Sequence, residues 1–329
     1  MKKTLIAVAA LAATGAFAQV SVYGRLDVGY GAYTTTTAGV DTKRNGVSSH
    51  NSVSSMWGIK GSEDLGGGLK AFFQLEQDVY TANGNTGASG AAHGATSNGA
   101  FDRTSLVGVE GGFGKVAFGR DYTPMFKLIG SSDIHALSNL STVQSAAAAG
   151  GSTMPNQMFY STPNLSGFVG NLSLINTDTS SGASVDKVEG NNLTAVYNNG
   201  PLMVGFGVGT NKVTAAGVES KTEAKALAAA YNFGTFALRG GHTVSKVNAG
   251  NDAKETNIGA TMPLGKVTLG AQYGMNDNGA ATDNTGNDFV ISADYALSAK
   301  TALYAKTGTY AKIGDNKTTG TALGIKTVF

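Results

Sequence analysis

The feature that most constrains this chain is an alternation of apolar and polar residues that recurs along nearly its whole length. Between Val20 and Tyr30, for example, the apolar residues share one parity, whereas Arg25 and Asp27 lie on the other. Successive side chains of a β-strand point to opposite faces, so this period of two predicts strands with one apolar and one polar face. About sixteen segments carry the pattern, which predicts an all-β fold in a single domain.

The connections between these segments are short and long in alternation. Seven are turns of a few residues, such as 64–68 and 298–300, and eight are long loops, of which 123–156 is much the longest. A soluble β-sandwich rarely sustains this alternation over so many strands with only 14% charged residues. In an outer-membrane barrel, by contrast, apolar residues face lipid and polar residues face a watery lumen. We therefore predict a closed, 16-stranded antiparallel transmembrane β-barrel over residues 19–329, because hydrocarbon offers no partner to an unpaired backbone group.

Residues 1–18 have the features of a secretory signal peptide. Lys2 and Lys3 precede a short apolar run, and Ala16, Phe17 and Ala18 form a small-residue cleavage site. Without this segment the chain has 22 basic and 22 acidic residues. A nucleic-acid partner, which would require a basic excess, is therefore not expected. Cysteine is absent, so the sequence predicts no disulfide framework and no thiolate chemistry.

The stretch SEDLGGGLKAFFQLEQ (residues 62–77) allows two interpretations. Its three glycines and Lys70 resemble a phosphate-binding loop, but such a loop needs a helix directly after the glycines. The residues that follow alternate as a strand instead, with Lys70 and Glu76 on its polar face. We therefore interpret residues 66–68 as a tight turn, where glycine tolerates positive φ.

Three segments resemble a known family. They are SMWGIKGSEDLGGGLKAFFQLEQDV (55–79), FDRTSLVGVEGGFGKVAFGRDYTPMF (101–126) and NQMFYSTPNLSGF (156–168). They are similar to strands of the general porins of Gram-negative bacteria, in the branch typical of beta-proteobacteria and Neisseria. The resemblance implies a homotrimer in the outer membrane with short periplasmic turns and long extracellular loops. It also implies that the third long loop, 123–156, folds into the lumen, with an exposed surface loop as the alternative, and that Phe329 is recognised by the barrel-assembly machinery.

The resemblance further implies basic side chains on the barrel wall opposite the third loop. Strict alternation would aim Arg120 at lipid, so its predicted role in the lumen requires a bulge or a strand end just before it. The alternative for each charge is a solvated lumen residue without a role in selectivity. The residues expected at the constriction are Arg25, Lys60, Arg103, Arg120, Asp121, Lys127 and Asp133. Other charges expected to face the lumen are Asp27, Lys70, Glu76, Asp78, Arg239 and Lys326.

Together these features predict a water-filled channel for passive diffusion of small hydrophilic solutes and ions, with a mild preference for anions because the third loop and its surroundings are basic. The alternative is a plugged structural or adhesive barrel whose loops bind a partner. Outer-membrane lipid and lipopolysaccharide are the expected surroundings. No enzyme activity, cofactor or metal is expected, because the four histidines are scattered and neither HExxH nor GxSxG occurs.

Overall fold

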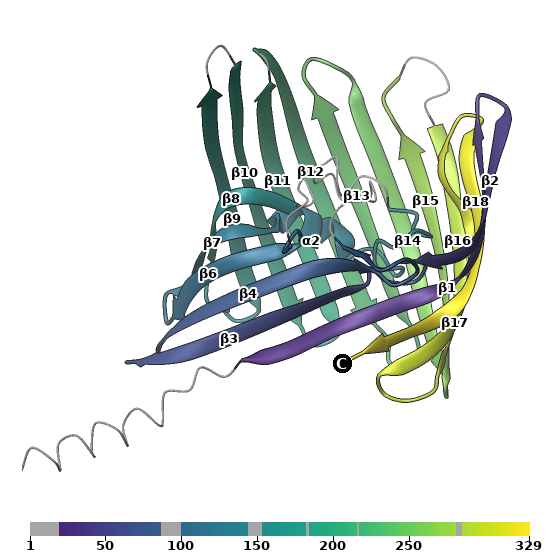
Figure 1. Cartoon of the computed structure of the whole chain (residues 1–329), viewed down its shortest axis with the longest axis horizontal. Coiled ribbons are helices and arrows are strands. Elements are labelled where there is room, and N and C mark those ends of the chain that lie inside the picture. Colours follow the sequence, from purple (N-terminus) through teal and green to yellow (C-terminus); the bar gives the residue numbers. More distant parts are fainter. Residues whose placement is uncertain (1–19, 87–99, 144–152, 182–183, 216, 281–284) are drawn as a thin grey trace, which may run out of the picture.

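The chain forms one antiparallel sheet that closes on itself as a barrel (Figure 1). The structure is a computed structural model that describes residues 20–86, 100–143, 153–181, 184–215, 217–280 and 285–329. Each strand of the wall pairs with its neighbours in the chain, and β1 (Ser21–Thr37) closes the circuit against β18 (Asn316–Val328). Of the 18 strands, β2 (Val40–Ser49) and the two-residue β5 (Asn85–Thr86) are additions to the wall. Sixteen strands therefore make the barrel, as the sequence predicts.

The remaining strands follow one another around the wall. The first half contains β3 (Met56–Gly66), β4 (Leu69–Tyr80), β6 (Thr104–Gly111), β7 (Gly114–Tyr122), β8 (Thr153–Ser161), β9 (Phe168–Ser181) and β10 (Ser184–Asn199). The second half contains β11 (Leu202–Ala215), β12 (Val218–Asn232), β13 (Ala237–Val247), β14 (Asp252–Leu264), β15 (Val267–Asp277), β16 (Thr285–Ala296) and β17 (Thr301–Ile313).

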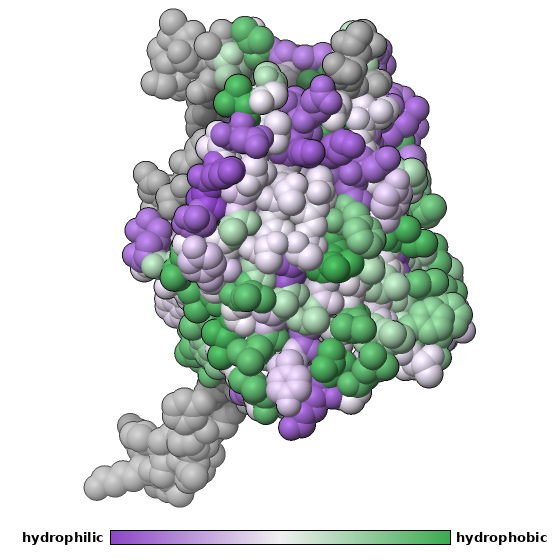
Figure 2. Space-filling model, turned by 90° about the vertical axis from the view of Figure 1, so that its right-hand side faces the viewer, coloured by the Kyte–Doolittle hydropathy of each residue, from purple (hydrophilic) through white to green (hydrophobic). Residues whose placement is uncertain are grey.

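The two faces of the wall differ as the alternation predicts. Large apolar side chains such as Val107, Phe118 and Ile258 are more than half exposed on the outside, whereas Asn192 and Gln272 are buried on the inside. On the face seen in Figure 2, hydrophobic residues gather in the lower part and hydrophilic residues at the top. A protein in water rarely exposes so much contiguous apolar surface, so the lower part forms a belt suited to lipid.

Short turns join the strands at one end of the barrel, here called the turn end, and longer connections lie at the other, the loop end. The triplet 66–68 forms the turn between β3 and β4, and all three glycines have positive φ, from +62° to +82°. This confirms the interpretation as a turn. At the loop end the prediction of irregular loops is partly wrong, because the expected loop 34–55 contains β2 and the long hairpin β9–β10 covers most of 178–190. Pairing these segments satisfies backbone groups that an irregular loop would leave to water.

The third long loop folds into the barrel, as expected. It begins with the short helix α2 (Pro124–Gly130), whose first turn is capped by the Thr123 hydroxyl accepting from the backbone of Phe126. Met125 and Leu128 are buried against the inner faces of β10, β11 and β12, where small residues make room for them. In the described part of the chain, no helix is long and apolar enough to cross a membrane. The segment SAAAAGGS (145–152), expected at the centre of this loop, lies outside the described residues.

Candidate functional site

A second segment also folds inward, which sequence reasoning did not predict. Residues 49–55, here called the inward segment, follow β2 and lie against the inner wall. Asp27 fixes them, because its carboxylate accepts from the backbone N–H groups of Ser52 at 2.5 Å and Val53 at 2.7 Å. The Tyr304 hydroxyl donates to the other carboxylate oxygen at 2.6 Å. Asp27 faces inward as predicted, but it is completely buried and anchors the chain rather than meeting solutes.

The third loop is joined to the inward segment and to the far wall of the barrel. Asn139 donates from its backbone to the carbonyl of His50 and from its side chain to the carbonyl of Ser49, both at 2.9 Å. On β17, the Lys306 ammonium donates to the Ser138 hydroxyl at 2.9 Å. Further contacts on this wall are those of Asn257 with Ser132, Gln272 with the N–H of Ile134, and Arg239 with the carbonyl of Ser131. The loop therefore crosses the lumen and is held on both sides.

A cavity of about 470 Å³, here called the basic passage, lies between the third loop, the inward segment and strands β15 to β18. Ser52, Val53, Ile134 and His135 line it from the two inward-folded segments. Its lining includes one carboxylate, Asp294, and five basic residues, which are Arg25, Lys266, Lys300, Lys306 and Lys326. The residues around this cavity therefore carry a clear surplus of positive charge.

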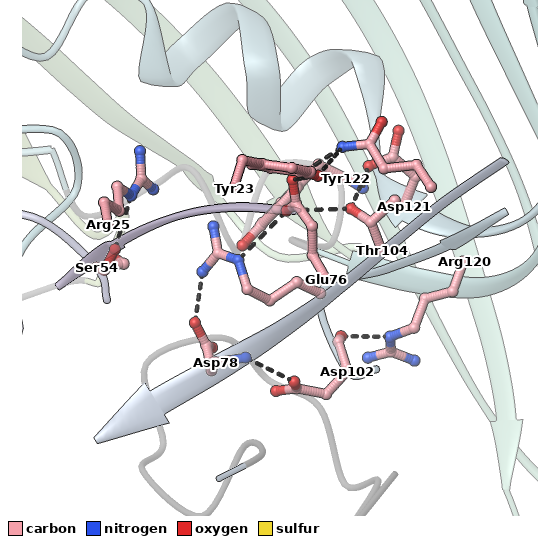
Figure 3. A network of polar contacts seen from close by, with 12 residues as sticks. Tyr23, Arg25, Ser54, Glu76, Asp78, Asp102, Thr104, Arg120, Asp121 and Tyr122 are labelled. Carbon is pink, nitrogen blue, oxygen red and sulfur yellow. Dashed lines mark hydrogen bonds and ion pairs between the residues drawn. The ribbon is translucent and has the colours of Figure 1, made fainter. Parts of the chain in front are cut away.

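The cations of the basic passage differ in how they are neutralised. Lys326 forms an ion pair with Asp294 at 2.9 Å and donates to the Ser52 hydroxyl at 3.1 Å. Arg25 uses its Nε to donate to the backbone carbonyl of Ser54 at 2.7 Å, and the two are labelled in Figure 3. Among the residues that the structure describes, no carboxylate forms an ion pair with Arg25. Arg25 therefore lines the passage without a carboxylate in direct contact.

Arg103 is neutralised by the wall strands beside it. Its guanidinium contacts the carboxylates of Asp78 at 2.5 Å and Glu76 at 3.6 Å, and it lies 5.2 Å from the centre of the Tyr122 ring. Glu76 also accepts from the Tyr23 hydroxyl at 2.7 Å. Arg103, Glu76 and Asp78 are each less than one-tenth exposed. Arg103, Glu76 and Asp78 are here called the arginine network. Figure 3 shows Glu76 and Asp78 together with Tyr23 and Tyr122.

The bulge that Arg120 requires is present. The register of β7 against β8 shifts between Gly119 and Asp121. Arg120 then donates to the carbonyl of Asp102 at 2.6 Å and to the Thr153 hydroxyl at 2.9 Å. These contacts hold the ends of three segments together.

The next two expected residues form a pair at the start of the third loop. The Lys127 ammonium, on α2, contacts the Asp121 carboxylate at 2.5 Å. Asp121 also accepts from Thr104 at 3.2 Å. This pair lines a second cavity beneath α2, on the side of the lumen opposite the basic passage.

The other predicted residues lie away from the constriction. Lys60 is one inward-facing position nearer to the turn end than Glu76, with its ammonium 5.0 Å from the Tyr23 ring centre. Lys70 is the cross-strand neighbour of Glu110, close to a turn at the same end. Phe329 exchanges two backbone hydrogen bonds with Gly24, which extends the closure of the barrel to the last residue.

Two titratable groups of the third loop are buried. The Asp133 carboxylate accepts from the N–H groups of His135 and Leu137 and from the Ser141 hydroxyl. Burial raises its pKa above the usual range of a carboxyl group. Burial, helped by the positive charge of Lys306, lowers the pKa of His135 to about 3. Asp133 therefore folds the loop instead of facing solutes, and His135 is neutral at pH 7.

Sequence reasoning missed Lys306 and the inward segment. Lys306 could have been found, because Leu303, Ala305 and Thr307 occupy the outward parity of β17 and place Lys306 inside. The inward segment carried no such signal, since it is a short polar stretch without periodicity. Within the described ranges, no group of three or more His, Asp or Glu residues could hold a metal ion.

The closed barrel, its apolar outer belt and the charged passage inside it define an outer-membrane channel protein. The family then follows from comparison with known proteins. A sequence profile of the family described as Gram-negative porin matches residues 4–316, and the chain belongs to this family.

The chain is 32% identical over 298 residues to the outer membrane porin protein 32 of Delftia acidovorans, which covers 85% of this chain and 81% of that protein. It is 37% identical over 128 residues to the major outer membrane protein P.IB of Neisseria gonorrhoeae, covering 38% of this chain and 33% of that protein. A solved anion-selective porin from Comamonas acidovorans matches with a TM-score of 0.77 and 27% identity, over 95% of this chain and 100% of that chain.

The family and the fold expected from the sequence are thereby confirmed. The protein is an outer-membrane porin that forms a water-filled channel for small hydrophilic solutes and ions.

Proposed function

We propose that this porin prefers anions, and that Arg25 is the side chain that contributes most to this preference. The observation that carries the proposal is the lining of the basic passage, with five basic residues, a single carboxylate and an unpaired Arg25. A channel selects ions by the charges along its narrow part. The surplus of positive charge would lower the energy of a passing anion and raise that of a passing cation.

The arginine network would contribute little to anion preference. Arg103 lies between two carboxylates, so the three side chains together carry a charge of −1 rather than +1. The pair of Asp121 and Lys127 is neutral. On that side of the lumen the remaining cation is Arg120, which donates to the carbonyl of Asp102 and to the Thr153 hydroxyl. The larger surplus would therefore lie on the side of Arg25, where five basic residues line the passage. The similar porin from Comamonas acidovorans is described as anion-selective, which supports a preference for anions in this protein as well.

We also propose the assembly and processing that the family implies. Removal of residues 1–18 would precede insertion into the outer membrane. Recognition of Phe329 by the barrel-assembly machinery would guide that insertion, and the mature protein would form a homotrimer surrounded by lipid and lipopolysaccharide. A solved trimer form of OmpT from Vibrio cholerae, at 17% identity and a TM-score of 0.65, shares the fold.

Reversal potentials in a KCl gradient across a planar bilayer test the proposal. The wild-type channel should give a potential with the sign of anion preference. A unit charge about 7 Å from a passing ion changes its energy by roughly 0.6 kcal/mol in water, with opposite signs for chloride and potassium. Arg25→Gln should therefore lower the permeability ratio of chloride to potassium about sevenfold. Lys60→Gln, nearer the turn end, is the matched control and should change the ratio less. A cation-selective wild-type channel would contradict the proposal.

A further inference from the structure

A separate cavity lies on the loop side of the constriction. This vestibule pocket has a volume of about 390 Å³, which falls within the range of small-molecule sites. It is formed by the inner face of the hairpin β1–β2, by Tyr80 at the end of β4, by Ala82 and Asn83 just after it, and by Asn139 of the third loop. Its floor includes Ser49, His50 and Asn139, which also join the third loop to the inward segment. A solute entering from the loop end would therefore meet this pocket before the basic passage.

Arg44 is the one charged residue in the described lining of this pocket. It is the cross-strand neighbour of Tyr33, and its guanidinium carbon lies 5.1 Å from the centre of the Tyr33 ring. In the described part of the chain, no ion pair involves Arg44. A guanidinium that rests on a ring keeps the N–H groups at its edge free to bind a carboxylate with two parallel hydrogen bonds.

Aromatic rings form much of the remaining wall. The rings of His50 and Tyr80 lie 4.6 Å apart with an interplanar angle of 35°, and Tyr33 adds a third ring. Asn45 and Asn83 supply amide groups to the lining. Rings of this kind offer planar surfaces against which a second aromatic group can stack. Such walls would add little to the binding of an inorganic anion, so among anions they favour an organic solute.

We propose that the vestibule pocket binds small aromatic carboxylates and loads them into the channel. The carboxylate would be held by Arg44, and the ring of the solute would lie against Tyr33, His50 and Tyr80. The proposal rests on the proposed anion preference, because a bound anion must then pass Arg25. Arg25 is eight positions from Tyr33 along β1, roughly 27 Å at the rise of a strand. The two arginines are therefore separate sites, and each can be removed alone.

Calorimetric titration of the purified protein with sodium benzoate tests this site, with heats of mixing into empty detergent micelles subtracted. Benzoate should bind saturably, and sodium acetate and benzyl alcohol should each bind more weakly, because one lacks the ring and the other the charge. Loss of a charge-assisted hydrogen-bonded pair weakens binding by roughly tenfold or more, which is the expected effect of Arg44→Gln. The benzoate affinity of Arg44→Lys should lie between those of the wild type and Arg44→Gln, since lysine keeps the charge and loses the paired geometry.

Lys43→Gln is the matched control, because Lys43 is the adjacent residue on the opposite face of β2 and should leave benzoate affinity unchanged. Channel conductance in KCl shows that each variant is folded. Equal benzoate affinity in Arg44→Gln and wild type would overturn the proposal, and so would a loss of affinity in Arg25→Gln alone. The salt-gradient potential is measured without benzoate, so the two proposals can fail separately. A cation-selective channel would refute the anion preference. If its benzoate binding still depended on Arg44, the proposal for this pocket would hold.

Discussion

Arg25 and Arg103 lie within the same barrel on inward-facing segments, yet their surroundings are opposite. Arg25 contacts a backbone carbonyl of the inward segment and lines the basic passage. Arg103 is enclosed by Glu76, Asp78 and an aromatic ring. Under the proposed anion preference, an arginine inside this barrel would contribute to selectivity only if its neighbours leave its charge uncompensated. The residue type is the same in both cases, so the difference arises from the neighbours of each side chain.

Breaking the arginine network should have the largest effect. Arg103→Leu would leave two buried carboxylates without their cation, and losing one partner of a buried pair costs about 3 to 5 kcal/mol. We expect a marked fall in the midpoint of thermal unfolding in detergent. The unfolding is measured as the loss of the β-sheet circular dichroism signal on heating. Arg103→Lys keeps the positive charge and should lose less, and Arg25→Gln should unfold close to the wild-type temperature. If Arg103→Leu were as stable as Arg25→Gln, the contrast between the two arginines would be wrong.

Residue patterns predicted the frame in which these arginines lie. The alternation placed Arg25, Asp27 and Lys326 inside the barrel, because parity is set locally by the strand. The glycine triplet 66–68 could be recognised as a turn for the same local reason, since its positive φ values require glycine.

The partners of the inward-facing charges could not be predicted in this way. Asp27 is bound by Ser52 and Val53, 25 and 26 residues further on, and by Tyr304, 277 residues away. Such contacts depend on how the closed barrel brings distant strands and a non-periodic segment together. The same limit applies to Arg103, which family resemblance marked as a pore residue without indicating the carboxylates that neutralise it.

The next largest effect is expected from pH, which should change the stability of the folded protein through His135 beside the basic passage. The pKa of His135 is about 3 in the folded protein and about 6.5 in an unfolded chain. The unfolded chain therefore binds more protons between these values, so the stability that neutral His135 contributes is complete above pH 6.5 and is lost as the pH falls toward 3. Asp133, whose pKa is raised, acts with the opposite slope.

Comparing wild type with His135→Gln isolates the histidine from Asp133. The wild type should lose roughly 1 to 2 kcal/mol more than the variant between pH 7 and pH 5, measured as the change in unfolding temperature. His242→Gln is the control, because His242 lies on the outer face of β13, bonded to Thr256. Parallel pH profiles for wild type and His135→Gln would show that burial of His135 does not affect stability.

The arginine network can also be made to resemble the surroundings of Arg25. Asp78→Asn changes the charge of the network from −1 to 0 while keeping a side chain of the same size. The permeability ratio of chloride to potassium should rise, by at most about sevenfold from the same Coulomb estimate. Glu63→Gln, an exposed residue near the turn end of β3, removes an acid outside the network and serves as the control. An unchanged ratio for Asp78→Asn would mean that the network does not act on passing ions, and a fall would contradict the expected direction.

The smallest effect is expected within the basic passage itself, at the pair of Lys326 and Asp294. This pair resembles the arginine network in miniature, but both side chains keep more than a quarter of their surface exposed, at 28% and 29%. Water and salt screen such a pair, so its contribution to stability is small. Asp294→Asn should therefore leave the unfolding temperature nearly unchanged and raise the preference for chloride by less than Asp78→Asn does. Asp315→Asn, in the exposed hairpin between β17 and β18, is the matched control. A large loss of stability in Asp294→Asn would show that enclosure by neighbouring residues does not separate structural from selective charges in this barrel.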